Sequence, residues 1–263
     1  AAALDAGKVS ETTTFEDKGF EFIDGFTIKN ALEKKYGVSS IKDVLLYSIN
    51  TGAIFAARSI GRDVFSQYVE RFGFGVLSGI ELDSEVSGNI ESLAKRGEIF
   101  MATGSFGHGL TTTPLQLIAA YGAIANHGTL MKPQIVKETR YADGRLVPHT
   151  PVELRQVIST RTAAVMSHIL TAVIDDGHAK RAGVKGYSLG GKTGTAQIPD
   201  PKGGYLDEYI HTFIGFGPSN NPRFVILVKY ERPNQRFADA TTVNTFAKVA
   251  KFLVQYLNIP PQR

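Results

Sequence analysis

The sequence contains no cysteine and no tryptophan, and it has no long apolar run. Without thiols the chain has no disulfide, no thiolate nucleophile and no thiolate metal site, and redox chemistry is not expected. No window of about 18 apolar residues occurs, as a membrane helix would need. Residues 1–15 lack both the basic and the continuous apolar segment of a signal peptide. We therefore predict that any membrane anchor or export signal lies outside these 263 residues.

Positive charge is in slight excess, but it is not concentrated. The net charge is +4, and lysine and arginine alternate with acids in segments such as 29–37 and 90–98. A nucleic-acid surface needs a basic stripe, so we predict a solvated surface and no nucleic-acid partner. The histidines occur singly, without HxxxH or HExxH spacing, and we predict no metal and no cofactor. They are His108, His127, His149, His168, His178 and His211.

Helical patterns come first along the chain and strand patterns come last. The clearest helix start is Thr113-Pro114-Leu115-Gln116, where the threonine is an N-cap, the proline takes the first helical position and the glutamine completes a capping box. Ser40 with Asp43 predicts another start. This order favours an α+β fold in one domain. Further helices are predicted over 1–7, 61–72, 159–176 and 241–257, and an antiparallel meander of strands over 191–197, 209–217 and 223–231.

The segment Lys192-Thr193-Gly194-Thr195 has two interpretations. With Gly186 and Gly191 it completes the pattern G-x-x-x-x-G-K-[ST] of a phosphate-binding loop. Such a loop joins a buried strand to the N-terminus of a helix. Here the preceding segment is polar, and residues 194–204 contain three glycines and two prolines, which no helix accommodates. We therefore disfavour a nucleotide site.

On the second interpretation, these residues lie on an edge strand beside an active site. The lysine supplies positive charge for an anionic substrate end, Gly194 lets a substrate backbone approach closely, and the threonine hydroxyls donate to a carboxylate. Serine enzymes that act on penicillins carry Lys-Thr-Gly together with S-x-x-K and Ser-x-Asn elements. Alone, the tripeptide more often marks a glycine-bearing strand with a surface lysine.

A Ser-x-Asn element occurs at Ser48-Ile49-Asn50, directly after the helix that Ser40 begins. A short turn there would direct both polar side chains into a cleft. The alternative is a helix C-cap in which Asn50 is left-handed. The order and separation of the two motifs favour a shared site of Ser48, Asn50 and Lys192, within hydrogen-bond reach of about 3 Å or one water.

Longer segments resemble the class B penicillin-binding proteins over nearly the whole chain. They are 102–136, of the Ser-Phe-Gly-x-Gly type running into a Thr-Pro-Leu-Gln helix, 190–197 with Lys-Thr-Gly, the hairpin 211–228, and the closing 256–261. The resemblance implies the penicillin-binding transpeptidase fold shared with serine β-lactamases. In this fold a helical subdomain packs against an antiparallel sheet flanked by helices, and the cleft lies between them.

The resemblance also implies roles for the site residues. Ser48 relays protons between lysines and the departing group, Asn50 hydrogen-bonds the substrate peptide, and Lys192 tunes the site electrostatically. Thr193 and Thr195 hold the terminal carboxylate of the stem peptide, and the Thr195 N–H is one of two donors of an oxyanion hole.

The serine nucleophile of S-x-x-K is not expected within this chain. Two S-x-x-K strings occur, Ser39-Ser-Ile-Lys42 and Ser92-Leu-Ala-Lys95. This is about the number that chance supplies in a chain of this composition. Ser39 lies too close to Ser48 along the chain to begin a separate catalytic helix. Ser92 lies in a glycine-rich segment that we expect to be a variable loop. In the family, the helix that carries S-x-x-K is followed by a segment similar to residues 1–9 of this chain. We therefore expect residues 1–263 to be a partial transpeptidase domain, without the anchor, pedestal and S-x-x-K segment.

These expectations define a function and its alternatives. A whole enzyme of this kind attacks the D-Ala-D-Ala end of peptidoglycan stem peptides, forms an acyl-enzyme and passes it to an amine, at the extracytoplasmic face of the bacterial membrane. Its partners would be stem peptides, β-lactams and cell-wall synthesis proteins. A β-lactamase or carboxypeptidase relative and a non-catalytic scaffold of the division or elongation machinery remain alternatives.

Overall fold

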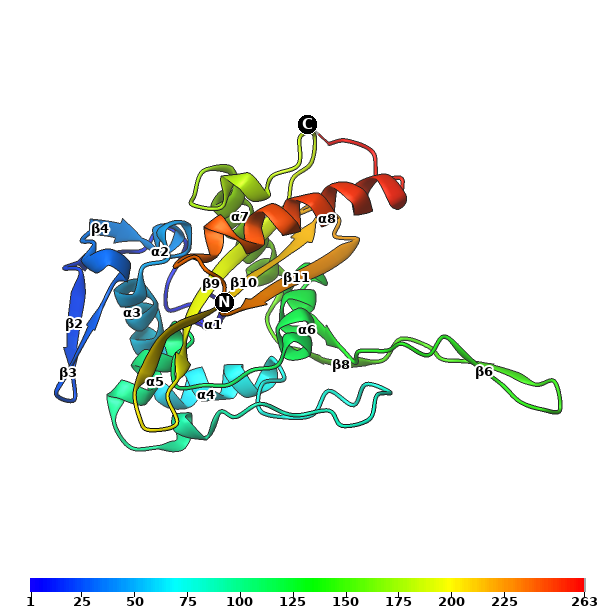
Figure 1. The fold of residues 1–263 in the computed structure, drawn as a ribbon, viewed down its shortest axis with the longest axis horizontal. Helices are drawn as coiled ribbons and strands as arrows, with labels where there is room; N and C mark the ends of the chain where they lie inside the picture. The colour runs from blue at the N-terminus through cyan, green and yellow to red at the C-terminus, as the bar shows by residue number, and fades with distance from the viewer. Residues whose placement is uncertain (263) are drawn as a thin grey trace.

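A three-stranded antiparallel sheet forms the centre of one half of the protein (Figure 1). The computed structural model describes residues 1–262, and the strand order is β11–β10–β9. β9 spans Gly190–Pro199, β10 spans Tyr205–Gly217 and β11 spans Phe224–Glu231. Within the described residues β9 pairs with β10 alone, so β9 is an edge strand. The predicted meander is confirmed, with β10 beginning at Tyr205 instead of Tyr209.

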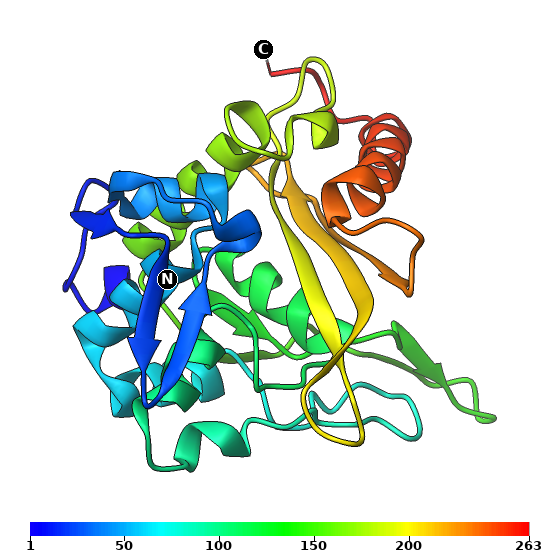
Figure 2. The same cartoon turned by 60° about the vertical axis from the view of Figure 1, so that its left-hand side comes forward.

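Helices cover both faces of this sheet. α8 (Thr242–Tyr256) lies against one face, and α6 (Pro114–Ala125) and α7 (Thr160–Asp175) lie against the other, as the turned view in Figure 2 shows. Phe213 of β10 packs on Phe246 of α8, with ring centroids 4.6 Å apart. Side chains three positions apart on a strand point to opposite faces. Accordingly, Phe216 is buried with residues of α6 and α7.

The two helix starts with the clearest sequence signals are confirmed. Thr113 Oγ1 accepts a hydrogen bond from Gln116 N (3.2 Å), and the Gln116 side chain accepts one from Thr113 N (3.1 Å). Ser40 and Asp43 form the same reciprocal pair before α2 (Ile41–Tyr47). Both boxes satisfy backbone donors that the first helical turn leaves unpaired.

A helical block stands beside the sheet, and its helices come from the first 105 residues of the chain. Its helices are α1 (Ala2–Asp5), α2, α3 (Asn50–Ile60), α4 (Arg62–Arg71) and α5 (Glu98–Ser105). The sequence does not predict α3, because its N-cap residue Ile49 makes no side-chain cap bond. α3 nevertheless forms because tertiary packing buries residues such as Ile54 and Ala57. Packing thus decides a helix that local signals miss.

Short strands fill the region between α1 and α2. β1 (Thr14–Asp17) pairs with β4 (Gly37–Ser40), and β2 (Phe20–Ile23) forms a hairpin with β3 (Phe26–Lys29). Four more short strands lie farther along, and the β6–β7 pair extends as an arm in Figure 1. These are β5 (Thr129–Met131), β6 (Glu138–Arg140), β7 (Leu146–Pro148) and β8 (Glu153–Gln156). Among the described residues, no helix combines the length and apolarity that crossing a bilayer requires.

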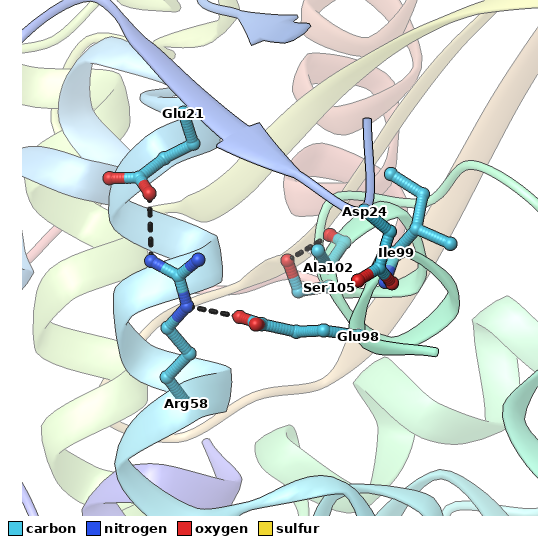
Figure 3. A network of polar contacts seen from close by, with 7 residues as sticks. All are labelled: Glu21, Asp24, Arg58, Glu98, Ile99, Ala102 and Ser105. Atoms are coloured by element: carbon cyan, nitrogen blue, oxygen red, sulfur yellow. Dashed lines mark hydrogen bonds and ion pairs between the residues drawn. The ribbon is translucent and has the colours of Figure 1, made fainter. Parts of the chain in front are cut away.

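Polar contacts fasten the β2–β3 hairpin to the helical block (Figure 3). Arg58 of α3 forms ion pairs with Glu21 of β2 (2.8 Å) and with Glu98 of α5. Asp24, in the turn of the hairpin, accepts a hydrogen bond from Ile99 N (2.9 Å) in the first turn of α5. The hairpin is therefore held at its base and at its turn, close to the helix that follows Ser48.

Candidate active site

β9 presents Lys192, Thr193, Gly194 and Thr195 along the open edge of the sheet. Lys192 is paired with Ile214 and Thr195 with His211 of β10. The chain after Lys192 continues as a strand to Pro199. No helix begins there, so the phosphate-binding loop is excluded as the sequence indicates.

The structure brings Ser48 and Lys192 into contact. Lys192 Nζ donates to Ser48 Oγ at 3.0 Å, although 144 positions separate the two residues. Ser48 is the C-cap residue of α2 and has φ 57° and ψ 52°. This left-handed conformation is costly for any residue with a Cβ. Backbone strain of this kind accumulates at functional sites, so Ser48 is a candidate on geometry as well as on motif.

Lys192 is partly buried, and its environment favours the neutral amine more than water does, although the charged form still prevails at pH 7. Besides Ser48, its ammonium group donates to the Thr193 carbonyl (3.2 Å) and to Thr193 Oγ1 (3.3 Å). Desolvation lowers the pKa of Lys192 to about 8. An amine with this pKa, in hydrogen-bond contact with a hydroxyl, is able to exchange protons near neutral pH.

Asn50 begins α3 and faces the β2–β3 hairpin. Its side-chain amide donates to the Lys29 carbonyl at the end of β3 (3.0 Å). The left-handed residue of the Ser-x-Asn turn is Ser48, so the alternative of a left-handed Asn50 cap is wrong. The helix that follows requires Asn50 itself to be helical.

A buried carboxylate that the sequence analysis missed holds this turn. Asp17 accepts hydrogen bonds from Thr51 Oγ1 (2.6 Å), Tyr36 N (2.7 Å) and Gly19 N (2.9 Å), and both of its oxygens lie 3.0 Å from Asn30 Nδ2. Asn30 Oδ1 in turn accepts from Thr51 N (3.1 Å). Asp17 is fully buried, and Thr51 is the neighbour of Asn50. No local signal marks Asp17, because its partners come from four different places along the chain.

Two histidines flank the Lys-Thr-Gly strand, and the sequence assigns neither to the site. His178 contacts the Leu46 carbonyl (2.6 Å) and Thr193 Oγ1 (2.7 Å). His211, opposite Thr195, is fully buried and contacts Thr241 Oγ1 (2.9 Å) and the Arg236 carbonyl (3.1 Å). A single histidine carries no spacing signal, so only the three-dimensional contacts identify this pair.

The two S-x-x-K strings do not present a serine as a nucleophile would require. Ser39 is 5% exposed in β4, and its hydroxyl donates to the Gly37 carbonyl (3.3 Å). Ser92 lies in a short 3-10 turn with Oγ buried and no hydrogen-bond partner. A nucleophilic serine needs an exposed hydroxyl beside a base, which neither string supplies.

An edge strand with Lys-Thr-Gly that contacts a Ser-x-Asn turn is the arrangement of serine enzymes that act on penicillins. The chain belongs to the penicillin binding protein transpeptidase domain family, whose model matches residues 1–251. It is similar to stage V sporulation protein D of Bacillus subtilis, with 35% identity over 89% of this chain and 36% of that protein. It is also similar to peptidoglycan D,D-transpeptidase FtsI of Escherichia coli, with 28% identity over 98% of this chain and 42% of that protein.

Solved structures agree with this assignment. Penicillin binding protein 3 from Mycobacterium tuberculosis, complexed with aztreonam, has a TM-score of 0.91 and 29% identity, covering 100% of this chain and 61% of that one. A complex of the same protein with ampicillin has a TM-score of 0.91. The resemblance to class B penicillin-binding proteins and the α+β transpeptidase fold are thereby confirmed. The chain spans about two fifths of the length of the curated relatives described here.

The strained backbone of Ser48 leads to a stability prediction. Ser48→Ala removes the hydroxyl but keeps a Cβ in the left-handed conformation, whereas Ser48→Gly removes both. We expect the glycine variant to be more stable than the alanine variant by about 1 kcal/mol, because glycine adopts φ 57° without steric cost. Urea unfolding of both proteins measures the difference. An alanine variant at least as stable as the glycine variant would contradict it.

Gly194 leads to a second prediction. It pairs with Thr212 of β10, and a Cβ at Gly194 would overlap the Thr212 hydroxyl. Gly194→Val therefore disturbs sheet packing as well as the approach of a substrate backbone. Because alanine already has the overlapping Cβ, we expect Gly194→Ala to lower both the melting temperature and the affinity for the substrate peptide. Adding Thr212→Ala should restore the melting temperature but not binding, because it removes the overlap and leaves the new methyl group. Recovery of both would show that the glycine is only structural.

Proposed function

We propose that this chain is the larger part of the catalytic domain of a peptidoglycan D,D-transpeptidase. In the complete enzyme a serine attacks the D-Ala-D-Ala end of a stem peptide, releases D-alanine and forms an acyl-enzyme, which an amine of a neighbouring strand then attacks. The observation that carries the proposal is the 3.0 Å hydrogen bond from Lys192 to Ser48, which joins the two motifs at the open sheet edge.

The residues take complementary roles in this proposal. Ser48 passes protons between Lys192 and the leaving amine, and Asn50 positions the peptide. Thr195 Oγ1 accepts a hydrogen bond from Ala238 N (3.2 Å), which keeps its own proton available for the terminal carboxylate. Gly194 allows the substrate backbone to lie along β9. The Thr195 N–H supplies one donor to the oxyanion hole.

The substrates and setting follow from the same proposal. β-Lactams would bind in the same cleft, because relatives with this fold have been solved with ampicillin and aztreonam. Since the curated relatives include peptidoglycan transpeptidases, we place the site at the extracytoplasmic face of the bacterial cytoplasmic membrane. There it would act beside other cell-wall synthesis proteins. We further propose that the nucleophile comes from an S-x-x-K segment outside residues 1–263.

Mass spectrometry with benzylpenicillin tests this function. The mass of residues 1–263 should stay unchanged, because among the described residues neither S-x-x-K string presents an exposed serine hydroxyl to its lysine. A protein that joins these residues to an S-x-x-K segment should gain one penicillin. A stoichiometric adduct on Ser39, Ser48 or Ser92 of the shorter chain would place the nucleophile within it. No adduct on the longer protein would contradict the function.

A further inference from the structure

His178 links the two elements that meet in the cleft. It lies between α7 and β9, and its ring contacts both α2 and β9. Nδ1 is 2.6 Å from the carbonyl of Leu46, two residues before Ser48. Nε2 is 2.7 Å from Oγ1 of Thr193, the residue after Lys192. A hydrogen-bonded ring therefore spans from the Ser-x-Asn helix to the Lys-Thr-Gly strand.

The chemistry of the two contacts fixes where the protons are. A carbonyl oxygen only accepts, so Nδ1 carries a hydrogen. In neutral histidine Nε2 then has a lone pair and accepts from the Thr193 hydroxyl. That hydroxyl has one proton, so Thr193 cannot donate to a ligand at the same time. Its oxygen is left to accept from Lys192 Nζ, 3.3 Å away.

The neighbouring hydroxyl has the opposite arrangement. Thr195 Oγ1 accepts from the backbone N–H of Ala238, and Thr195 is exposed. Its proton therefore remains available for an acceptor outside the protein. Of the two threonines in Lys-Thr-Gly-Thr, only Thr193 gives its proton to a titratable side chain.

We propose that His178 is a positioning residue that sets the direction of the Thr193 hydroxyl and couples the binding of a carboxylate ligand to proton uptake. Neutral His178 takes the hydroxyl hydrogen bond. When His178 binds a proton from solvent, Nε2–H donates to Thr193 Oγ1, and the hydroxyl rotates its own proton toward the ligand carboxylate. No covalent bond to Thr193 changes. This inference rests on the proposed function in one respect, that Thr193 faces the terminal carboxylate together with Thr195, as the family resemblance implies.

Charged groups on two elements act on His178. Burial and then the Lys192 ammonium of β9 lower the pKa of His178, and the Leu46 carbonyl and Asp239, in the turn before α8, oppose this less strongly. The lowered pKa favours the neutral ring at pH 7. In that form the Thr193 hydroxyl gives its proton to Nε2 and does not donate to a ligand. A bound carboxylate adds negative charge and favours the protonated ring. By linkage, carboxylate binding must then strengthen as the pH falls.

NMR of residues 1–263 tests the inference without any acylation. Correlation of the ring nitrogens with ring protons should show the Nδ1–H tautomer for His178. The affinity for N-acetyl-D-alanyl-D-alanine should rise about tenfold from pH 7 to pH 5, the worth of one hydrogen bond to a charged group. Lys192 stays protonated over this range, since its pKa is about 8. The carboxamide of the same dipeptide should show no such dependence.

Two variants distinguish a positioning role of His178 from a purely structural one. In His178→Gln the amide reproduces both hydrogen bonds of the neutral ring but does not bind a proton, so binding should be weak and independent of pH. His168→Gln, at an exposed residue of α7 that pairs with Glu11, should keep the dependence of the wild type. Melting temperatures confirm that each variant is folded.

The outcomes also separate this inference from the proposed function. An Nε2–H tautomer, or dipeptide binding that is equal at pH 5 and pH 7, would overturn the role of His178 and leave the function standing. If neither the acid nor the amide binds at any pH, the assignment of the cleft to D-Ala-D-Ala ends fails, and the role of His178 fails with it.

Discussion

Replacement of Lys192 by methionine is expected to lower the rate of penicillin acylation by a factor of about 10² to 10⁴, the usual worth of a positioned proton-transfer group. The measurement uses a protein in which residues 1–263 are joined to an S-x-x-K segment. Methionine keeps an unbranched side chain only one atom shorter but removes the amine that donates to Ser48. Lys248→Met, at an exposed position of α8, is the matched control and should leave the rate unchanged.

The same variant has a pH signature in stability. Burial lowers the pKa of Lys192 to about 8, below the value of 10.5 for a free lysine. Between these two values the unfolded chain binds more protons than the folded one, so Lys192 makes stability rise with pH in that window. We expect this part of the rise to disappear in Lys192→Met, as urea unfolding at pH 7 and pH 10 would show. An identical rise in wild type and variant would contradict the burial of this amine.

Replacement of Asp17 by alanine is expected to lower the free energy of unfolding by at least about 3 kcal/mol. The change leaves the donors of Thr51, Asn30, Tyr36 and Gly19 without their common acceptor in a buried site. Each unsatisfied buried donor costs about 1–3 kcal/mol. Asp63→Ala, where the side chain is 84% exposed, should change stability by less than about 0.5 kcal/mol.

The pH dependence of Asp17 has the opposite sign to that of Lys192. Burial alone would raise the pKa of Asp17, but hydrogen bonds from Thr51, Gly19, Tyr36 and Asn30 outweigh it and hold the pKa below the usual 3.8. The stabilisation is therefore complete above about pH 4 and is lost as the pH falls through the folded pKa. The stability difference between wild type and Asp17→Asn should shrink from pH 7 toward pH 2. A constant difference would show that shape, not charge, holds the site.

Local patterns predict much of this fold because the physics behind them is local. The capping boxes at Ser40 and Thr113 need only residues three apart, and both are present as expected. The three-strand meander follows from a change in periodicity and from turns between neighbouring segments. By contrast, α3 lacks a capping signal and is stabilised by burial. No local sequence pattern therefore predicts it.

The sequence by itself determined the family, the α+β class and the candidate residues Ser48, Asn50 and Lys192. These follow from short motifs and from the order of helical and strand patterns, which can be read directly from the chain. Only the tertiary structure decided which groups meet. The bond from Lys192 to Ser48, the buried carboxylate of Asp17 and the bridge through His178 join residues that are far apart in the sequence. Such contacts depend on how helices and sheet pack together, and no periodicity or spacing encodes them.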